Sequence, residues 1–335
     1  MINPEFSFKT QPAEIKLELN LSKAAELFIH EDKRFPLYSE THGVRKWKNF
    51  FSNNPQGRAQ VEVLLKRQHK ITEIKEIFRK NDLPEELAFV AFVESYFNPN
   101  ARSHAGAVGV WQFMPHTARS FGLRVNWWID ERLNPDKSTQ AAVSYFKKLY
   151  RMLGDWDLVI MAYNYGEYGL KRKIREYGIP ECYDELPRET RSFLVKIKAL
   201  IQLFNEYEFA RIDNEDDEVY VQYPMKGYWE LEEIAYKLHF SRKALKKLNP
   251  EYKHGYLLKG TNYIRVPEKY YAKLKKLKSE NRADGKVIKL KIKKGDTVYA
   301  ISRKFNLGYK KLMRINNISN AKKIRPGQTL YIPIS

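Results

Sequence analysis

The stretch Leu87-Ala-Phe-Val-Ala-Phe-Val-Glu94-Ser95 decides how this sequence is interpreted, because one carboxylate closes an otherwise apolar helical run. Glu94 follows Val90 by four residues and Leu87 by seven, so it lies on the helix face that carries core side chains. Burial disfavours the charged form of a carboxyl group and raises its pKa, which suits a general acid. A buried glutamate paired with an arginine fits the same pattern, and the pattern alone leaves both interpretations open.

Segments with helical spacing of apolar residues surround this stretch. We predict a helix over 58–80, ended by Asn81-Asp-Leu-Pro84, and a mostly helical domain up to about residue 210. The other predicted helices cover roughly 115–122, 137–153, 155–164 and 188–210.

The loop from Asn98 to Pro115 is dense in small residues and ends in an amide, an aromatic ring and a methionine. Such a strip can line a groove for a sugar, whose apolar faces stack and whose hydroxyls and amides need polar partners. The alternative is an ordinary surface loop with Trp111 anchored in the core.

Beyond residue 219 the apolar pattern repeats with an offset of 67 residues, which sets Asn249 under Asn316 and Ile234 under Ile301. Each copy of about 50 residues is expected to form a strand, two short helices and a strand. In the second copy, the turn at Lys294-Gly-Asp-Thr297 supplies an Asp or Thr cap for the first helix.

These patterns divide the chain into six segments. They are an N-terminal arm over 1–40, a helical domain over 41–212, an acidic linker over 213–218, a first repeat over 219–268, a lysine-rich helical linker over 269–285 and a second repeat over 286–335.

The charge is strongly positive, since 60 Lys and Arg against 40 Asp and Glu give a net charge of +20. Such a charge predicts an acidic partner, which can be nucleic acid, an anionic membrane surface or an anionic polymer. A basic surface that only keeps the protein soluble is the alternative. Residues 286–335 hold 13 basic residues and one acid, Asp296, so most of the charge belongs to the second repeat.

Composition excludes several classes. With 43% hydrophobic and 14% aromatic residues, the composition is not that of a disordered chain. The sequence contains no run of about 18 apolar residues, so it predicts no transmembrane helix. Cys182 is the one cysteine and the seven histidines lack ligand-like spacing, so we expect no disulfide, no metal and no cofactor. Residues 1–6 carry no basic segment followed by an apolar one, so we expect no secretory signal in the chain as written.

Four motifs occur in one order along the chain: Glu94-Ser95, Gly106-Ala-Val-Gly-Val-Trp-Gln-Phe-Met-Pro115, Ala162-Tyr-Asn-Tyr-Gly166 and Glu189-Thr-Arg191. The set resembles the lytic transglycosylases of the soluble-Slt type, and most closely the membrane-bound lytic murein transglycosylase D branch. The stretches Asp130-Glu-Arg-Leu-Asn-Pro135 and Lys137-Ser-Thr-Gln-Ala-Ala142 are similar to that branch too. The two repeats resemble LysM modules, and the first is degenerate because it lacks the Gly-Asp-Thr turn.

The resemblance implies an α+β multidomain fold, with a mostly α goose-lysozyme-like catalytic domain followed by two small βααβ LysM-like modules. It implies that Glu94 is the catalytic acid and then the base, with Ser95 in structural support. The substrate-binding residues would be Ser103 and Gln112 on the amino sugars, Met114 in the cleft wall, Tyr163 orienting or polarising the catalytic carboxyl, Asn164 supporting the same turn, and Glu189 beside the cleft. Trp111 and Phe113 stand where many relatives carry smaller aliphatics, which leaves the shape of the sugar subsites open.

The implied reaction is non-hydrolytic cleavage of the MurNAc-β-1,4-GlcNAc bond of peptidoglycan, which gives 1,6-anhydroMurNAc ends. The LysM modules would bind GlcNAc-containing glycan. The implied location is the periplasm or outer membrane of a Gram-negative bacterium, with membrane association through an anchor before residue 1 left open. The alternatives are a goose-type lysozyme, which is a hydrolase, and a non-catalytic peptidoglycan-binding protein. Nucleic acid is not expected as a partner, because the basic repeat carries no nucleic-acid motif.

Overall fold

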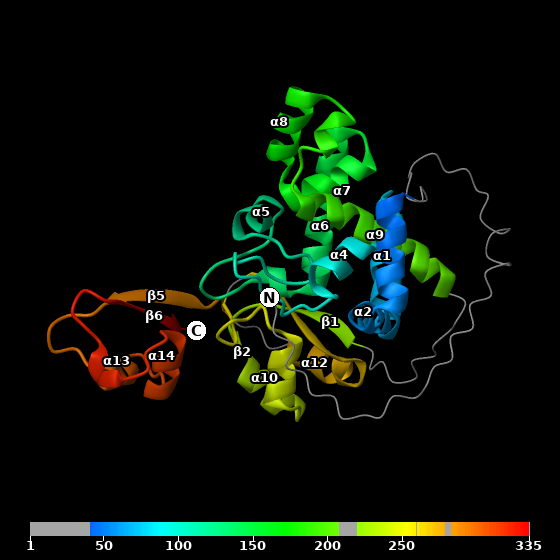
Figure 1. Ribbon diagram of the computed structural model, residues 1–335. Coiled ribbons are helices and arrows are strands. Elements are labelled where there is room, and N and C mark those ends of the chain that lie inside the picture. The colour runs from blue at the N-terminus through cyan, green and yellow to red at the C-terminus, as the bar shows by residue number, and fades with distance from the viewer. Residues whose placement is uncertain (1–40, 208–219, 259, 279–282, 335) are drawn as a thin grey trace.

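The computed structural model describes residues 41–207, 220–258, 260–278 and 283–334, and Figure 1 traces their course. The expected N-terminal arm over 1–40 and the acidic linker over 213–218 lie outside the described residues. Three parts follow one another along the chain. We name them the helical domain (41–207), the first module (220–278) and the second module (283–334).

The helical domain is built from helices that pack around one apolar core. Its α-helices are α1 (His42–Asn53), α2 (Pro55–Lys66), α3 (Gln68–Arg79), α4 (Ala88–Ser95), α5 (Pro115–Ser120), α6 (Pro135–Leu153), α7 (Trp156–Tyr165), α8 (Glu167–Tyr177) and α9 (Arg188–Tyr207). Short 3₁₀ turns cover Glu85–Leu87, Glu131–Leu133 and Glu181–Tyr183.

Helix α4 lies in the centre of this domain and packs against α3 and α9. Its apolar residues from Ala88 to Phe92 are fully buried, and the ring of Phe89 meets that of Phe204 edge-on with centroids 5.4 Å apart. Burying each large apolar side chain contributes about 1.5–3 kcal/mol, so the apolar run fixes α4 firmly in the core. Glu94 is carried on this helix, one residue before its end.

Two helices replace the single helix predicted over 58–80. The backbone leaves the helical region at Arg67, with φ −114° and ψ 19°, so α2 ends there and α3 begins. The Arg67 guanidinium donates a hydrogen bond to the carbonyl oxygen of Tyr96, a contact that the local sequence pattern cannot indicate. Helix α8 was not predicted, because it is strongly polar and Leu170 is its one fully buried residue.

The first module contains two small antiparallel sheets and three α-helices. Strand β1 (Tyr220–Met225) pairs with β4 (Asn262–Pro267), and β2 (Trp229–Glu230) pairs with β3 (Tyr256–Leu257). Helices α10 (Leu231–Leu238) and α11 (Arg242–Leu248) lie between β2 and β3 in the chain, and a 3₁₀ turn at Glu268–Tyr270 leads into α12 (Tyr271–Lys278).

The second module has the strand–helix–helix–strand order that was predicted. Strand β5 (Lys286–Lys291) pairs antiparallel with β6 (Thr329–Ile334), and α13 (Val298–Lys304) and α14 (Tyr309–Ile315) lie between them, followed by a 3₁₀ turn at Ala321–Lys323. The predicted cap is confirmed, since the Thr297 hydroxyl accepts a hydrogen bond from the Ala300 amide at 3.1 Å. At the corresponding helix of the first module, Glu230 makes no such side-chain cap.

The internal repeat is confirmed by a pair of equivalent asparagines. Asn249 donates to the carbonyl of Arg265 at 2.9 Å and accepts from its amide at 2.7 Å. Asn316 donates to the carbonyl of Tyr331 at 3.0 Å and accepts from its amide at 2.7 Å. Each asparagine therefore clamps the end of its second helix to the last strand of its module, at the offset that the sequence indicated.

The lysine-rich segment over 269–285 is helical in α12, as expected, and it packs on the first module. Leu274 is fully buried there beside β1, and Leu277 packs against the same core. Most of this segment therefore belongs to the packed body of the first module.

Two absences and the state of the single cysteine concern the residues that the structure describes. None of their helices combines the length and apolar character that a membrane span requires. No group of three His, Cys, Asp or Glu side chains within them is placed to hold a metal ion. The Cys182 thiol is buried, and burial raises its pKa, which disfavours the reactive thiolate.

Candidate active site

Glu94 presents a carboxyl group that has no hydrogen-bond partner among the described residues. The side chain is partly buried at the end of α4, where the backbone turns sharply through the left-handed Tyr96, with φ 54°. Burial raises the pKa of Glu94 to about 7; the negative charge of Glu189 adds to this rise and Lys196 opposes it. A protonated form of the Glu94 carboxyl is therefore available at neutral pH.

Ser95 ties the end of α4 to the loop that follows. Its hydroxyl donates to the Val110 carbonyl at 2.7 Å and also contacts the Ala91 carbonyl at 3.2 Å. The bond to Val110 holds the loop against the helix that carries Glu94, which is the structural support expected of Ser95.

The loop over 101–114 folds back on itself beside α4. Val108 forms isolated β-bridges with Arg102 and with Phe113, and the Ser103 hydroxyl accepts the Ala107 amide at 3.0 Å. Gly109 has a φ of +86°, and a Cβ at this position would lie 1.9 Å from the Arg132 carbonyl oxygen. Only glycine fits there, which explains the small residue at this point of the motif.

Gln112 has its carboxamide oriented by the same loop. The side-chain Nε2 donates to the carbonyl of Gly109 at 2.7 Å and to that of Ala101 at 3.3 Å. Both amide protons are used within the loop, so Oε1 is the atom left to accept a hydrogen bond from a bound hydroxyl or amide.

Trp111 and Phe113 point into the core of the helical domain. The Trp111 indole is fully buried, donates to the Thr139 hydroxyl at 3.0 Å and stacks on Phe78 with ring centroids 5.6 Å apart. Phe113 is buried against Tyr145 and Tyr163. The bulk of these two residues therefore fills the interior, and Met114, which is 43% exposed, is the apolar side chain of this strip that reaches solvent.

Tyr163 braces the loop from α7. Its hydroxyl donates to the Trp111 carbonyl at 2.7 Å, and its ring stacks on Phe146 with centroids 5.1 Å apart. Burial raises the pKa of Tyr163, and the charge of Glu94 adds to this rise. The Glu94 charge is therefore felt at Tyr163, while the Tyr163 hydroxyl itself bonds to the loop through the Trp111 carbonyl.

Asn164 joins the end of α7 to the start of α9. Its Oδ1 accepts a hydrogen bond from the buried Thr190 hydroxyl at 2.8 Å. The neighbouring Glu189 is exposed, and its charge is felt by Glu94. The motifs around Asn164 and Glu189, 25 residues apart in the sequence, are thus brought together near Glu94.

Lys196 is the charged residue near Glu94 that the sequence analysis missed. Burial lowers its pKa and the Glu94 charge opposes this change, while its ammonium lies 5.4 Å from the centre of the Trp47 ring. Lys196 follows Glu189 by seven residues on α9, which places the two on one helix face. That spacing is the signal by which it could have been found.

A buried ion pair behind the loop holds it at its middle and near its C-terminal end. The Arg132 guanidinium binds the Asp130 carboxylate through two nitrogens, at 2.9 and 2.8 Å. Its remaining nitrogen donates to the carbonyls of Gly106 and Phe113, each at 2.9 Å. The Asp130–Pro135 stretch therefore positions the loop that carries Ser103, Gln112 and Met114.

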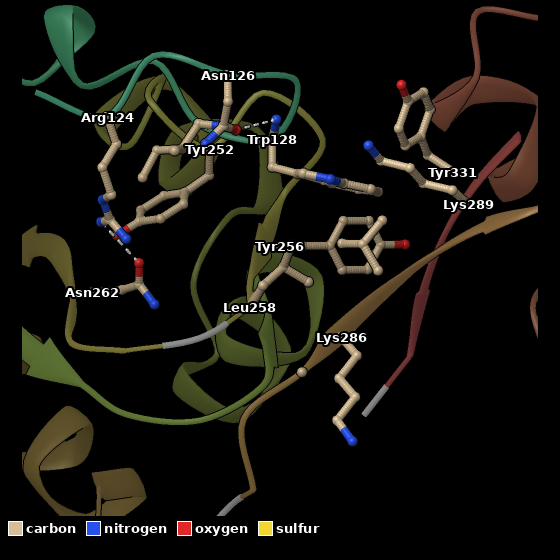
Figure 2. Close-up of a pocket in the computed structure, with 13 residues that line it drawn as sticks. Arg124, Asn126, Trp128, Tyr252, Tyr256, Leu258, Asn262, Lys286, Lys289 and Tyr331 are labelled. Carbon is tan, nitrogen blue, oxygen red and sulfur yellow. Dashed lines mark hydrogen bonds between the residues drawn. The ribbon is translucent and has the colours of Figure 1, made fainter. Parts of the chain in front are cut away.

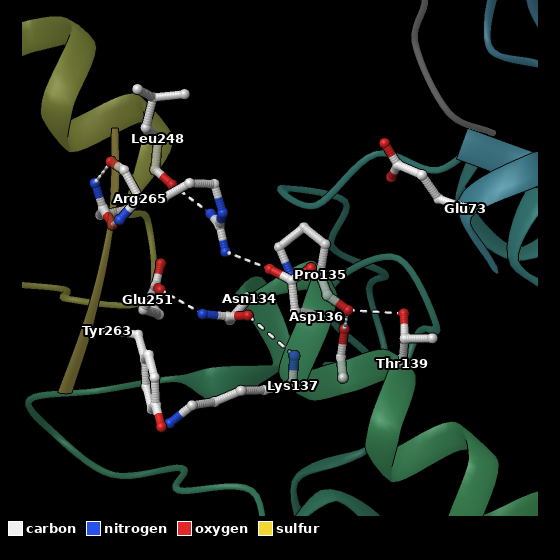
Figure 3. Close-up of polar contacts among 12 residues, drawn as sticks. Glu73, Asn134, Pro135, Asp136, Lys137, Thr139, Leu248, Glu251, Tyr263 and Arg265 are labelled. Atoms are coloured by element: carbon white, nitrogen blue, oxygen red, sulfur yellow. Dashed lines mark hydrogen bonds and ion pairs between the residues drawn. The ribbon is translucent and has the colours of Figure 1, made fainter. Parts of the chain in front are cut away.

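The first module packs against this same stretch, as Figure 3 shows for Asn134 and its neighbours. Asn134 donates to the Glu251 carboxylate at 2.6 Å, and the Asp130 amide donates to the Glu251 carbonyl at 2.9 Å. At the edge of the contact, Arg265 reaches Asp136 at 3.3 Å. The first module is therefore joined to the segment that supports the loop.

Glu131 supplies the charged centre of the junction. It is 2% exposed and binds the Arg124 side chain at 2.8 Å and the Lys137 ammonium. Burial acts to raise the pKa of Glu131, but the hydrogen bonds from Arg124 and Lys137 outweigh it and lower the pKa.

Comparison with known proteins agrees with this division of the chain. Residues 72–184 match the transglycosylase SLT domain, 217–283 match the LysM-like domain of lytic transglycosylase MltD, and 290–333 match the LysM domain. Of the predicted site residues, Glu189 alone lies outside the SLT match.

Individual relatives match over different lengths. The membrane-bound lytic murein transglycosylase D of Escherichia coli K12 is 27% identical over 76% of this chain and 61% of its own, so the chain spans about three fifths of that relative. The peptidoglycan transglycosylase gp16 of Escherichia phage T7 is 41% identical over 31% of this chain and 8% of its own. The crystal structure of the 70-kDa soluble lytic transglycosylase Slt70 from Escherichia coli covers 50% of this chain and 33% of its own, with 18% identity and a TM-score of 0.36.

The resemblance drawn from the sequence motifs is confirmed by the three domain matches and by the similarity to transglycosylase D. By domain content and order the chain is MltD-like, with a transglycosylase SLT domain followed by an MltD-type LysM-like domain and a LysM domain.

Proposed function

We propose that this protein is a peptidoglycan lytic transglycosylase that cleaves the MurNAc-β-1,4-GlcNAc bond without water. One observation carries the proposal: Glu94 holds an unpartnered carboxyl whose pKa is raised to about 7, beside the loop that the SLT motif forms. A protonated carboxyl at neutral pH can donate to a leaving glycosidic oxygen, and its conjugate base can then accept a proton.

Glu94 performs both proton transfers in the proposed reaction. Its carboxyl proton moves to the glycosidic oxygen as the bond to the anomeric carbon of MurNAc breaks, while the N-acetyl group of the same sugar assists at that carbon. The Glu94 carboxylate then takes the proton of the C6 hydroxyl, whose oxygen bonds to the anomeric carbon. The ring closes to the 1,6-anhydro product, Glu94 is protonated again, and no water is consumed.

A single acid suffices for this chemistry, whereas most glycosidases use two carboxylates. Glu189 is the one other acid whose charge acts on the Glu94 pKa among the described residues. We assign Glu189 to substrate contact beside the cleft, where its negative charge keeps Glu94 protonated. A water-activating role for Glu189 would make the protein a goose-type lysozyme, which the products distinguish.

The remaining site residues bind and orient the sugar in this proposal. The free Oε1 of Gln112 accepts from a sugar hydroxyl or acetamido N–H, the exposed Ser103 contacts the same amino sugar, and Met114 walls the cleft. Tyr163 and Asn164 act by holding the loop and α9 in place around Glu94.

The two modules hold the enzyme on its polymer in this proposal, and they raise the local substrate concentration by tethering. The basic second module suits a glycan whose stem peptides carry carboxylates. We also propose a periplasmic or outer-membrane location, because peptidoglycan is found there in Gram-negative bacteria.

Mass spectrometry of the fragments released from purified peptidoglycan tests the proposal. We expect anhydro-muropeptides, each lighter by one water than the hydrolytic product, with Glu94→Gln as the inactive control. Products with reducing MurNAc ends would identify a lysozyme instead. Intact polymer after treatment with the wild-type protein would indicate a binding protein without catalytic activity.

A further inference from the structure

A pocket of about 560 Å³ lies where the three parts of the chain meet. The helical domain lines it with the loop over 124–129, the first module with residues near 252–262, and the second module with β5 and β6. Figure 2 shows side chains from all three parts facing this space. Neither Glu94 nor any other residue assigned above to the sugar cleft lines it, so it is a separate site.

Aromatic rings form the walls of this junction pocket. Trp128 and Tyr256 meet edge to face, with ring centroids 6.1 Å apart, and Tyr331 lines the pocket from the second module. Next to them, the Trp127 ring is stacked between His254 and Tyr331, at 5.4 and 5.2 Å. Such rings present flat apolar faces, which suit the apolar faces of a sugar ring.

The charges that line the pocket are all positive. Arg124, Lys286 and Lys289 are its ionisable cations, and no acidic residue lines it. Arg124 is paired with Glu131, but Lys286 and Lys289 form no ion pair within the described part of the chain, and Lys289 lies over the Tyr331 ring at 5.9 Å. A ligand that fits the pocket electrostatically therefore carries negative charge.

Polar atoms around the pocket are buried without partners. The hydroxyl of Tyr256, a lining residue that is only 3% exposed, has no hydrogen-bond partner among the described residues. Trp127 Nε1 and His254 Nε2 have none either, but they belong to residues outside the pocket lining. A buried polar atom without a partner has lost its bonds to water and gained none in return, so such atoms are rare unless something else satisfies them. Tyr256 lines the pocket, so a hydroxyl or amide group of a bound ligand would satisfy its hydroxyl.

We propose that the junction pocket is a second glycan-binding site, which takes an amino-sugar unit bearing a carboxylate, such as a peptide-substituted MurNAc. The rings hold the sugar face, Lys286 and Lys289 bind the carboxylate, and the Tyr256 hydroxyl meets a hydroxyl or amide group of the ligand. This proposal rests on the proposed function, since the same polymer supplies the ligand. The site needs all three parts of the chain, so it belongs to neither module alone.

Calorimetry with the full chain carrying Glu94→Gln, which prevents cleavage, tests the site. The probes are a peptidoglycan tetrasaccharide with its stem peptides and uncharged chitotetraose. Lys286→Glu combined with Lys289→Glu is compared with Lys304→Glu combined with Lys310→Glu, which makes the same charge change in the same module outside the pocket. We expect about tenfold weaker binding of the peptide-bearing probe to the first variant, equivalent to about 1.4 kcal/mol. Its binding to the control variant should stay close to that of the parent.

Two further measurements test whether the ligand contacts the aromatic wall and the lining segments of the pocket. Trp128→Ala should weaken both probes and Trp128→Phe should restore most of the binding, with thermal melting as the check on folding. Hydrogen exchange should show that the peptide-bearing probe protects residues 124–129 and 286–291.

Equal losses in both charge variants, or no protection of these two segments, would overturn the pocket proposal. Turnover of peptidoglycan by the wild-type protein is scored separately. If that protein releases no anhydro products while the pocket variants still lose binding, the proposed function fails and the binding site stands.

Discussion

Two carboxyl groups of the helical domain, Glu94 at the candidate site and Glu131 at the junction with the first module, differ in whether a cation is bonded to them. Glu131 is bound by Arg124 and Lys137, and its pKa is lowered. Glu94 has no bonded partner, and its pKa is raised to about 7. Both side chains lie within the protein, so burial does not separate the two cases. The presence or absence of a bonded cation does.

This difference speaks against one of the two interpretations that the apolar run around Glu94 left open, since no arginine pairs with Glu94 among the described residues. A paired buried glutamate exists in this domain, and it is Glu131. The cations that pair Glu131 are absent from the Glu94 carboxyl, whose charged neighbour Lys196 acts only at a distance. An unpaired carboxyl is free to exchange its proton with a ligand, whereas a paired one holds the architecture together.

The largest effect is expected from Glu94→Gln. General acid–base catalysis contributes about 10²–10⁴-fold, so turnover of purified peptidoglycan should fall by at least that range. The free energy of unfolding of the variant should instead rise at neutral and higher pH. Because the folded pKa lies near 7 and the unfolded pKa near 4.3, the wild type loses free energy of unfolding as pH rises between these values.

Above pH 7 the uncharged amide of the Glu94→Gln variant avoids that loss, and the variant should be more stable by about 1–3 kcal/mol. Urea unfolding at pH 5 and pH 8 checks this, since the gain should be clearly larger at pH 8 than at pH 5. A variant that unfolds more easily than wild type at pH 8 would place Glu94 with the architectural carboxylates.

Glu131→Ala should destabilise the protein by about 3 kcal/mol. This lies at the low end for a broken buried pair, because Arg124 and Lys137 reach solvent. Glu76→Ala removes an exposed partner of Lys80 and is the matched control, with a much smaller expected loss because water and salt screen the exposed pair. Chemical denaturation measures both. Equal losses of unfolding free energy in the two variants would show that the buried Glu131 pair stabilises the protein no more than an exposed pair does.

Glu251→Ala should cost about 1–3 kcal/mol, because the Asn134 amide loses its acceptor inside the junction. Turnover of soluble glycan fragments should also fall, since the adjoining Asp130–Arg132 pair positions the loop over 101–114. Glu232→Ala, at the exposed pair with Arg314 between the modules, should leave turnover unchanged. Normal turnover of the Glu251 variant would show that the junction with the first module does not influence the candidate active site.

The smallest effects are shifts of the pH profile. Activity should fall above pH 7 as Glu94 loses its proton, because only the protonated acid starts the reaction. Glu189→Gln removes a negative charge and lowers the Glu94 pKa, so the alkaline fall in activity should move to lower pH. Lys196→Gln removes a positive charge and moves it to higher pH, each by a few tenths of a unit to about one unit.

The position of the alkaline limb of kcat/KM measures these shifts. Lys48→Gln should leave it in place, because the Lys48 charge is not among those that act on the Glu94 pKa. Shifts in the same direction for the Glu189 and Lys196 variants would contradict the electrostatic account.

The features that sequence predicts well here are those written into neighbouring residues. The apolar run at 87–93 indicated α4, and the aligned positions Asn249 and Asn316 indicated a repeat whose two clamps the structure bears out. In both cases the pattern depends on spacing within one element or between two copies of it.

The features that sequence missed depend on partners far along the chain. The break at Arg67 is accompanied by a bond to Tyr96, and the Tyr163 hydroxyl meets the carbonyl of Trp111, 52 residues away. The bonds from Arg132 to the loop, and from Asn134 to Glu251, likewise join distant segments. No local spacing encodes such contacts, because they exist only after the elements have packed.

The packing of α12 has a consequence for how far the second module can travel. Leu274 and Leu277 commit residues 271–278 to the first module, so the chain between Lys278 and β5 is only seven residues long. A fully extended chain of that length spans about 25 Å. Even if its contacts with the rest of the protein opened, the start of the second module would stay within this distance of the end of α12. A glycan held there would lie within a few sugar units of the first module, so each binding event would present neighbouring bonds of one strand to the enzyme.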